Sequence, residues 1–125
     1  MKRNVTLTVT SLLSNLFFTF HFADDIVRGF EQGDVSDYTG VLLVAAWLYT
    51  TLMLAERRWG LAIMLLFSIG AAGVPALHMS GAGIVGGRIA GSSGMFFWVW
   101  TLIGLGATGL VSAVLSARGL WSLRR

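Results

Sequence analysis

Residues 60–79 read GLAIMLLFSIGAAGVPALHM, a run of twenty positions without a single Asp, Glu, Lys or Arg. An α-helix rises about 1.5 Å per residue, so a run of this length crosses a hydrocarbon core of about 30 Å. A helix on the outside of a soluble bundle needs a polar face, and this stretch has none. It therefore predicts a helix that is surrounded by lipid.

Three other apolar runs complete the pattern, at about residues 5–26, 39–55 and 94–116. The chain has 125 residues, of which 55% are hydrophobic and only 12% are charged. A soluble domain carries about twice that share of charge. We therefore predict an all-α membrane protein, with one domain over residues 1–125 and four transmembrane helices in an up-down-up-down bundle.

The charged residues between the runs predict the orientation, because Lys and Arg collect on the cytoplasmic side of a membrane protein. The side that holds both termini and the turn at 56–59 has seven basic residues and one acid, namely Lys2, Arg3, Arg57, Arg58, Arg118, Arg124, Arg125 and Glu56. The other side has two basic residues and five acids, namely Arg28, Arg88, Asp24, Asp25, Glu31, Asp34 and Asp37. The net charges of +6 and −3 add up to the formal +3 of the chain. We expect cytoplasmic termini and a place in the cell (plasma or inner) membrane.

The positive charge does not indicate nucleic-acid binding, because the basic residues stand at the ends of apolar runs and form no continuous patch. The expected partners are the lipid bilayer and, as an open alternative, another membrane protein or a second copy of the chain. Gly81–Gly86 matches the G-x-G-x-x-G pattern of dinucleotide sites. That pattern requires a preceding strand and an acid about 20 residues later, and no Asp or Glu follows Glu56.

The first run differs from the others because polar residues line one half of the predicted helix. These residues are Thr8, Thr10, Ser11, Ser14, Asn15, Thr19, His21, Asp25 and Arg28. A cleaved signal peptide ending near Ala23 is an alternative interpretation, but it would place His21 where a small residue is needed. A retained helix explains the polar face better, since polar groups in lipid need partners inside the protein. For Asn15, near mid-membrane, we expect a hydrogen bond between helices.

Three titratable side chains are predicted to meet near the outer ends of the first and third helices. His21 and His78 lie 16 and 18 residues into runs that both lead outward, so their imidazoles reach similar depths. Asp25 stands one turn beyond His21 on the same helix face. The second and fourth helices begin near this level with Tyr38 and Trp98, and the loop before the fourth carries Arg88. These six residues are the candidate ligand-binding site.

Several functions are compatible with such a site. Histidine is the commonest metal ligand, so His21, Asp25 and His78 are candidate ligands for a metal ion. A small molecule or a lipid headgroup could bind there instead, and no particular cofactor is indicated. Alternatively, the three groups only end the helices at headgroup level or join two helices. An enzyme using His and Asp for acid–base chemistry on a lipid-like substrate, and a structural subunit of a complex, remain open.

Small residues in the third and fourth helices predict close helix packing, at Gly70, Gly73, Gly104, Gly106 and Gly109. Transport is the least expected function. A pathway across the membrane needs polar groups at mid-membrane on several helices, and the sequence indicates them only on the first.

Overall fold

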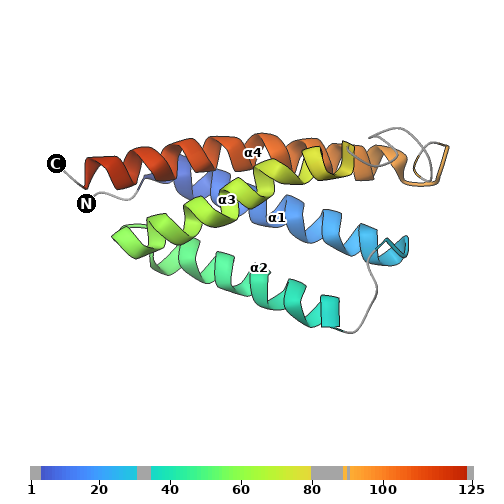
Figure 1. Ribbon diagram of the computed structural model, residues 1–125, viewed down its shortest axis with the longest axis horizontal. Coiled ribbons are helices and arrows are strands. Elements are labelled where there is room, and N and C mark those ends of the chain that lie inside the picture. Colours follow the sequence, from blue (N-terminus) through green and yellow to red (C-terminus); the bar gives the residue numbers. More distant parts are fainter. Residues whose placement is uncertain (1–3, 31–34, 80–88, 90, 124–125) are drawn as a thin grey trace.

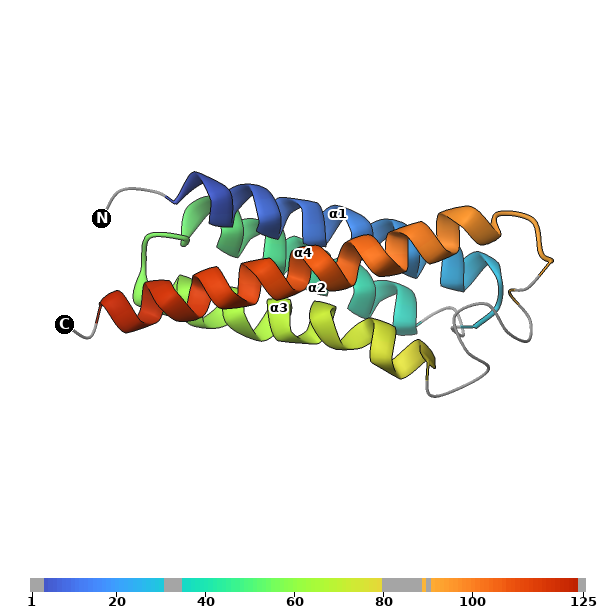
Figure 2. The same cartoon turned by 90° about the horizontal axis from the view of Figure 1, so that it is seen from above.

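The computed structural model describes residues 4–30, 35–79, 89 and 91–123, and within these ranges the chain forms four helices that lie side by side (Figure 1). They are α1 (Val5–Val27), α2 (Val35–Met53), α3 (Arg58–Met79) and α4 (Met95–Ser122). The beginning of α1, the end of α4 and the turn from α2 to α3 lie at one end of the bundle (Figure 2). We call this the terminal end and the other the far end. The four predicted helices are confirmed, and α4 extends six residues further than expected.

The helices have the surface of a membrane protein. α1, α3 and α4 are each long and apolar enough to cross a membrane, whereas α2 contributes a shorter apolar helix, Tyr38–Met53. Large apolar side chains are exposed on all four helices, among them Val5, Leu42, Met53, Leu66, Leu77, Phe96 and Leu110. Apolar exposure of this extent is typical of a surface that contacts lipid or another protein.

The apolar core consists of three small clusters that follow one another along the bundle. The first contains Leu7, Leu61 and Met64, the second Trp47, Ala71 and Leu105, and the third Ile89, Trp98 and Leu102. In the second cluster the Trp47 ring stacks on Phe67, with 5.3 Å between the ring centroids. Among the described residues of α2, Trp47 is the buried apolar side chain that packs against the other helices.

Glycines bring α4 close to its neighbours. Three of them face another helix where an added Cβ would meet an atom at 2.6–2.8 Å, namely Gly104 against Phe17, Gly106 against Pro75 and Gly109 against Ala71. These contacts confirm the predicted packing role of the α4 glycines. The prediction that Gly70 and Gly73 pack against another helix of this chain is wrong, because a Cβ at either would meet nothing within 4 Å. α3 instead turns its Ala71 and Pro75 toward α4.

Hydroxyl groups join the helices in the interior of the bundle. Ser11 and Thr51 share a hydrogen bond of 2.8 Å between their hydroxyls, and the Trp47 indole N–H donates to the Ser11 Oγ at 2.9 Å. The Ser14 hydroxyl donates to that of Thr108 at 2.9 Å. Each hydroxyl thereby finds a partner on another helix, as polar groups in lipid must.

Two further contacts complete this polar interior. Ser68 of α3 donates to Ser112 of α4 at 2.8 Å, and the Asn15 amide donates to the Val44 carbonyl at 3.0 Å. The interhelical hydrogen bond predicted for Asn15 is confirmed. The expectation that only the first helix carries mid-membrane polar groups is wrong, because the other three helices supply the hydroxyl and carbonyl partners. A serine or threonine in an apolar run can bond to its own backbone, so its sequence does not reveal such pairs.

Candidate metal centre

Three side chains from two helices converge near the far end of the bundle. His21 and Asp25 lie on α1, and His78 lies in the last turn of α3. The His21 Nε2 is 3.3 Å from the His78 Nε2, the His78 Nε2 is 3.2 Å from the Asp25 Oδ2, and the His21 Nε2 is 3.6 Å from the same oxygen. His21 and Asp25 are only 3% and 6% exposed, while His78 is partly open. We call these three residues the His–Asp cluster.

The other ring nitrogen of each histidine has a partner that fixes where the proton sits. The His78 Nδ1 lies 3.0 Å from the Val74 carbonyl, which can only accept, so this nitrogen carries the proton. The His21 Nδ1 lies 3.0 Å from the Thr101 hydroxyl. That hydroxyl also lies 2.9 Å from the Phe97 carbonyl, and when it donates there it accepts from His21. In this arrangement both neutral imidazoles turn an unprotonated Nε2 into the cluster.

The cluster consequently brings three electron-pair donors into contact. Two bare Nε2 atoms and a carboxylate oxygen cannot hydrogen-bond to one another without an added proton, because each is an acceptor. A positive charge between them resolves this. That charge is either a proton bound to one imidazole or a cation bound by all three atoms.

The dimensions of the triangle match a metal site. Ligand atoms about 2.0–2.1 Å from a tetrahedral Zn²⁺ lie about 3.3–3.4 Å from one another. The three sides here measure 3.2, 3.3 and 3.6 Å. The three donor atoms are thus spaced as three corners of a tetrahedron around one ion, and within the described ranges this is the one group of such residues arranged to hold a metal.

A second layer of contacts holds the three side chains in place. The Trp98 indole N–H donates to the Asp25 Oδ1 at 2.7 Å, which leaves the other carboxylate oxygen directed at the histidines. The indole ring also packs against both imidazoles, with centroids 5.1 Å from His21 and 5.3 Å from His78. Outer hydrogen bonds of this kind fix the orientation and tautomer of metal ligands. Through Trp98 and Thr101, α4 supports a site whose ligands lie on α1 and α3.

Arg28 ties the chain together just beyond the cluster. Its Nε donates to the Asp24 Oδ2 at 2.7 Å, and its two terminal nitrogens donate to the Ser92 hydroxyl at 2.9 Å and the Ser93 carbonyl at 2.8 Å. The end of α1 is thereby fixed to the segment that begins α4. Below this contact the buried Ile89 packs in one cluster with Trp98.

Four of the six candidate residues are brought together, namely His21, Asp25, His78 and Trp98. Tyr38 does not join them: it is 76% exposed at the start of α2, where that helix contacts α1 through Gly40 against the Phe22 ring. Tyr38 was predicted to join the site because it lies at a similar depth, but depth does not determine the direction in which a side chain points. Arg88 lies outside the described residues.

Sequence reasoning missed Thr101 and the Val74 carbonyl. Thr101 was within reach, because it follows Trp98 by three residues and so lies on the same helix face. A backbone carbonyl carries no sequence signal, although His78 at four residues beyond Val74 is well placed to bond it.

Comparison with protein-family models, with curated proteins and with solved structures finds no match to this chain. The function is therefore argued from the chemistry of the site.

Proposed function

We propose that this chain is a small multi-pass membrane protein that binds a divalent transition-metal ion through His21, Asp25 and His78. All four helices cross the bilayer in alternating directions, with both termini in the cytoplasm of a cell whose plasma or inner membrane holds the protein. The metal site then faces the outer side. The excess of Lys and Arg at the terminal end supports this orientation.

One observation carries the proposal: two imidazole nitrogens and one carboxylate oxygen meet at 3.2–3.6 Å while the remaining polar atom of each side chain is engaged elsewhere. Val74, Thr101 and Trp98 occupy those remaining atoms. This leaves one ring nitrogen of each histidine and one carboxylate oxygen turned toward one another. Metal ligands must be oriented in this way.

The donor set favours Zn²⁺ or a neighbouring first-row ion over Mg²⁺ and Ca²⁺. Two imidazoles and one carboxylate suit zinc, iron, nickel or copper, whereas magnesium and calcium prefer sites made of oxygen alone. Three protein ligands leave one tetrahedral position for water or a bound molecule. The partly open side of His78 is the place from which that fourth ligand enters.

The experiment measures metal content and zinc-dependent stability of the detergent-solubilised protein. After exposure to Zn²⁺ and removal of excess ion, we expect about one zinc per chain by elemental analysis, and a higher unfolding temperature. Free zinc at about 100 times the dissociation constant stabilises the folded state by about 2.7 kcal/mol. His21→Ala, His78→Ala and Asp25→Asn should each lose the bound zinc and the temperature shift, and Mg²⁺ should produce no shift.

Asp24→Asn is the matched control, because Asp24 neighbours Asp25 on α1 but pairs with Arg28 outside the cluster. It should keep the zinc. The proposal is wrong if the wild-type protein binds no zinc under these conditions. It is equally wrong if zinc binding survives in all three cluster variants, since the ion would then sit elsewhere.

The open coordination position supports a second candidate, a zinc-dependent hydrolase acting on a lipid-like ester. Zinc with three protein ligands lowers the pKa of its bound water and so supplies a nucleophile near neutral pH. Hydrolysis of a micellar p-nitrophenyl ester by the zinc-loaded protein would favour this function. Equal hydrolysis by the wild type and by His21→Ala would exclude it.

A further inference from the structure

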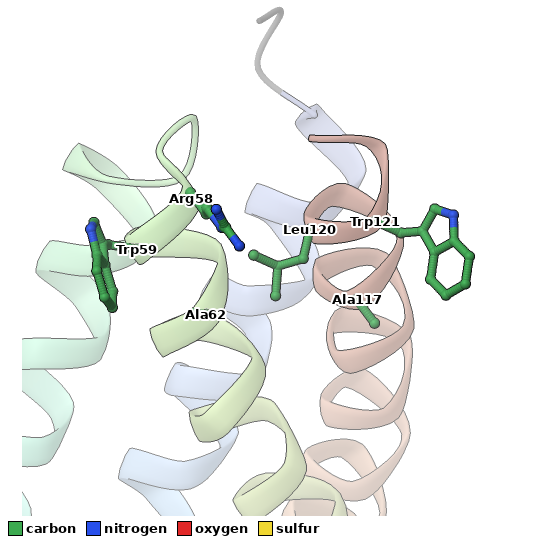
Figure 3. Close-up of a pocket in the computed structure, with 6 residues that line it drawn as sticks. All are labelled: Arg58, Trp59, Ala62, Ala117, Leu120 and Trp121. Atoms are coloured by element: carbon green, nitrogen blue, oxygen red, sulfur yellow. The ribbon is translucent and has the colours of Figure 1, made fainter. Parts of the chain in front are cut away.

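A second candidate site lies at the terminal end, remote from the His–Asp cluster. A groove of about 640 Å³ runs between the start of α3 and the end of α4, and it is lined by Arg58, Trp59, Ala62, Ala117, Leu120 and Trp121. The Arg58 side chain extends across it toward Leu120, and the two indole rings lie on either side (Figure 3). The groove thus combines one cation with an apolar wall.

The charge of this groove is not neutralised within the described part of the chain. No carboxylate lies within ion-pair distance of Arg58 there, and the neighbouring Glu56 is exposed. Two further exposed cations, Arg57 and Arg118, stand at the same end of the bundle. An arginine fork binds a phosphate with two parallel hydrogen bonds, so Arg58, which has no acidic partner among the described residues, is suited to a phosphate.

The two tryptophans place the groove at the surface of the bilayer. Trp59 is 80% exposed and Trp121 is 65% exposed, and indole rings collect where the hydrocarbon meets the headgroups. The rest of the wall is formed by the apolar side chains of Ala62, Ala117 and Leu120. A ligand here has its charged part beside Arg58 and an apolar part along the helices.

We propose that this groove binds one anionic phospholipid, with the phosphate on Arg58 and an acyl chain along Ala62, Ala117 and Leu120. The positive charge of Arg58 fits an anionic headgroup, and the apolar wall beside it fits an acyl chain. The site requires no metal and is independent of the function proposed for the His–Asp cluster.

The test is native mass spectrometry of the detergent-solubilised full chain with phosphatidylglycerol or phosphatidylcholine of equal chain length. The wild type should retain phosphatidylglycerol in preference. One arginine near a membrane contributes about 1 kcal/mol to anionic lipid binding, so Arg58→Gln should weaken phosphatidylglycerol binding about fivefold. Arg57→Gln and Arg118→Gln remove the same charge outside the groove and should change it less than twofold.

Two further measurements test whether the ligand is a lipid or a free phosphate compound, and whether it binds in the groove. Glycerol 3-phosphate, which has no acyl chain, should not displace the lipid, whereas Ala117→Trp should fill the groove and weaken lipid binding. Asp25→Asn should bind phosphatidylglycerol like the wild type. Equal retention of both lipids, or equal losses in the three arginine variants, would overturn the site, and displacement by glycerol 3-phosphate would show that a free phosphate suffices.

Discussion

The two ends of the bundle treat charge in opposite ways. At the far end, Asp25 and His21 are almost fully buried, and each forms a hydrogen bond to a side chain of another helix. At the terminal end, Arg57, Arg58 and Arg118 are exposed and form no ion pair with any described residue. The charged groups of the far end contact other residues of the protein, whereas the arginines of the terminal end are exposed to the surroundings.

This difference follows from the cost of burying charge. A buried ion must be compensated by close partners in good geometry, because otherwise the loss of hydration exceeds any gain. An exposed arginine keeps its hydration and gains only about 0–1 kcal/mol from a nearby acid. The far end is therefore suited to a site of fixed geometry, and the terminal end to a mobile ligand such as a lipid.

The largest effect on stability is expected from replacing Asp25, the acid that is buried at the far end. Replacing it with Leu removes the carboxylate from two imidazoles and leaves the Trp98 N–H without its acceptor. Breaking a buried pair of this kind costs about 3–5 kcal/mol. We expect a drop of this size in the free energy of unfolding, measured in detergent, together with complete loss of zinc. Asp25→Asn keeps an acceptor for Trp98 and should lose the zinc with a much smaller drop. Equal stability of the Leu variant and the wild type would contradict the assigned contacts.

Lowering the pH should weaken ligand binding at the far end but not at the terminal end. Imidazole must be deprotonated to bind a metal, so protons compete with zinc for the cluster, and zinc affinity should fall about tenfold or more between about pH 7.5 and pH 5.5. Arginine stays charged throughout, and phosphatidylglycerol binding should be unchanged over the same range. Zinc titrations and native mass spectra at both pH values measure this. Zinc binding that is independent of pH would exclude histidine ligands.

A smaller effect is expected at the second layer of the far end. Thr101→Val keeps the shape of the side chain but removes the acceptor of the His21 Nδ1–H. Loss of an outer partner weakens metal binding about 10–100-fold, and we expect the lower value because Asp25 still orients the cluster. Thr50→Val is the control, since the buried Thr50 hydroxyl donates to the Ala46 carbonyl of its own helix. Equal zinc affinities in the two variants would show that Thr101 does not position His21.

The smallest effect concerns the hydroxyls between the two ends. Ser68→Ala removes the hydrogen bond to Ser112, and such bonds between membrane helices contribute about 0.6 kcal/mol on average. Ser116→Ala should cost nothing, because the buried Ser116 hydroxyl has no partner within the described ranges. Unfolding of the two variants in mixed micelles measures the difference. A larger loss for Ser116 than for Ser68 would reveal a partner for Ser116.

The sequence predicted the helices and the His–Asp cluster for one shared reason, namely that distance along a helix converts directly into depth in the membrane. His21 and His78 matched in depth, and Asp25 lay one turn away from His21. Depth alone left the rotation of each helix about its axis undetermined. Tyr38 therefore satisfied the depth criterion, but its side chain is exposed and does not join the cluster.

Features that depend on rotation could not be predicted in the same way. The Ser68 to Ser112 bond and the contact of Gly106 with Pro75 both require knowing which faces of α3 and α4 meet. Before His78, the apolar run of α3 carries only Ser68 as a polar side chain, so no polar stripe marks the inward face of that helix. On α4, the hydroxyls of Thr101, Thr108, Ser112 and Ser116 do lie on one face, a signal that sequence reasoning missed. The polar face of α1 did mark its inward side, and the orientation of that helix toward its partners was predictable for this reason.

The hydrogen bonds of α1 have a consequence for biosynthesis. Its side chains pair with residues that are translated much later: Asp25 with a residue 73 positions on, His21 with one 80 positions on, and Ser14 with one 94 positions on. Chains emerge from the ribosome N-terminus first, so α1 must wait for α4 before these groups are satisfied. A chain that ends before α4 still holds Asp25 beside His21 and His78, but it lacks the partners that Trp98, Thr101 and Thr108 provide. The interior hydrogen bonds of α1 are therefore complete only once α4 has been inserted.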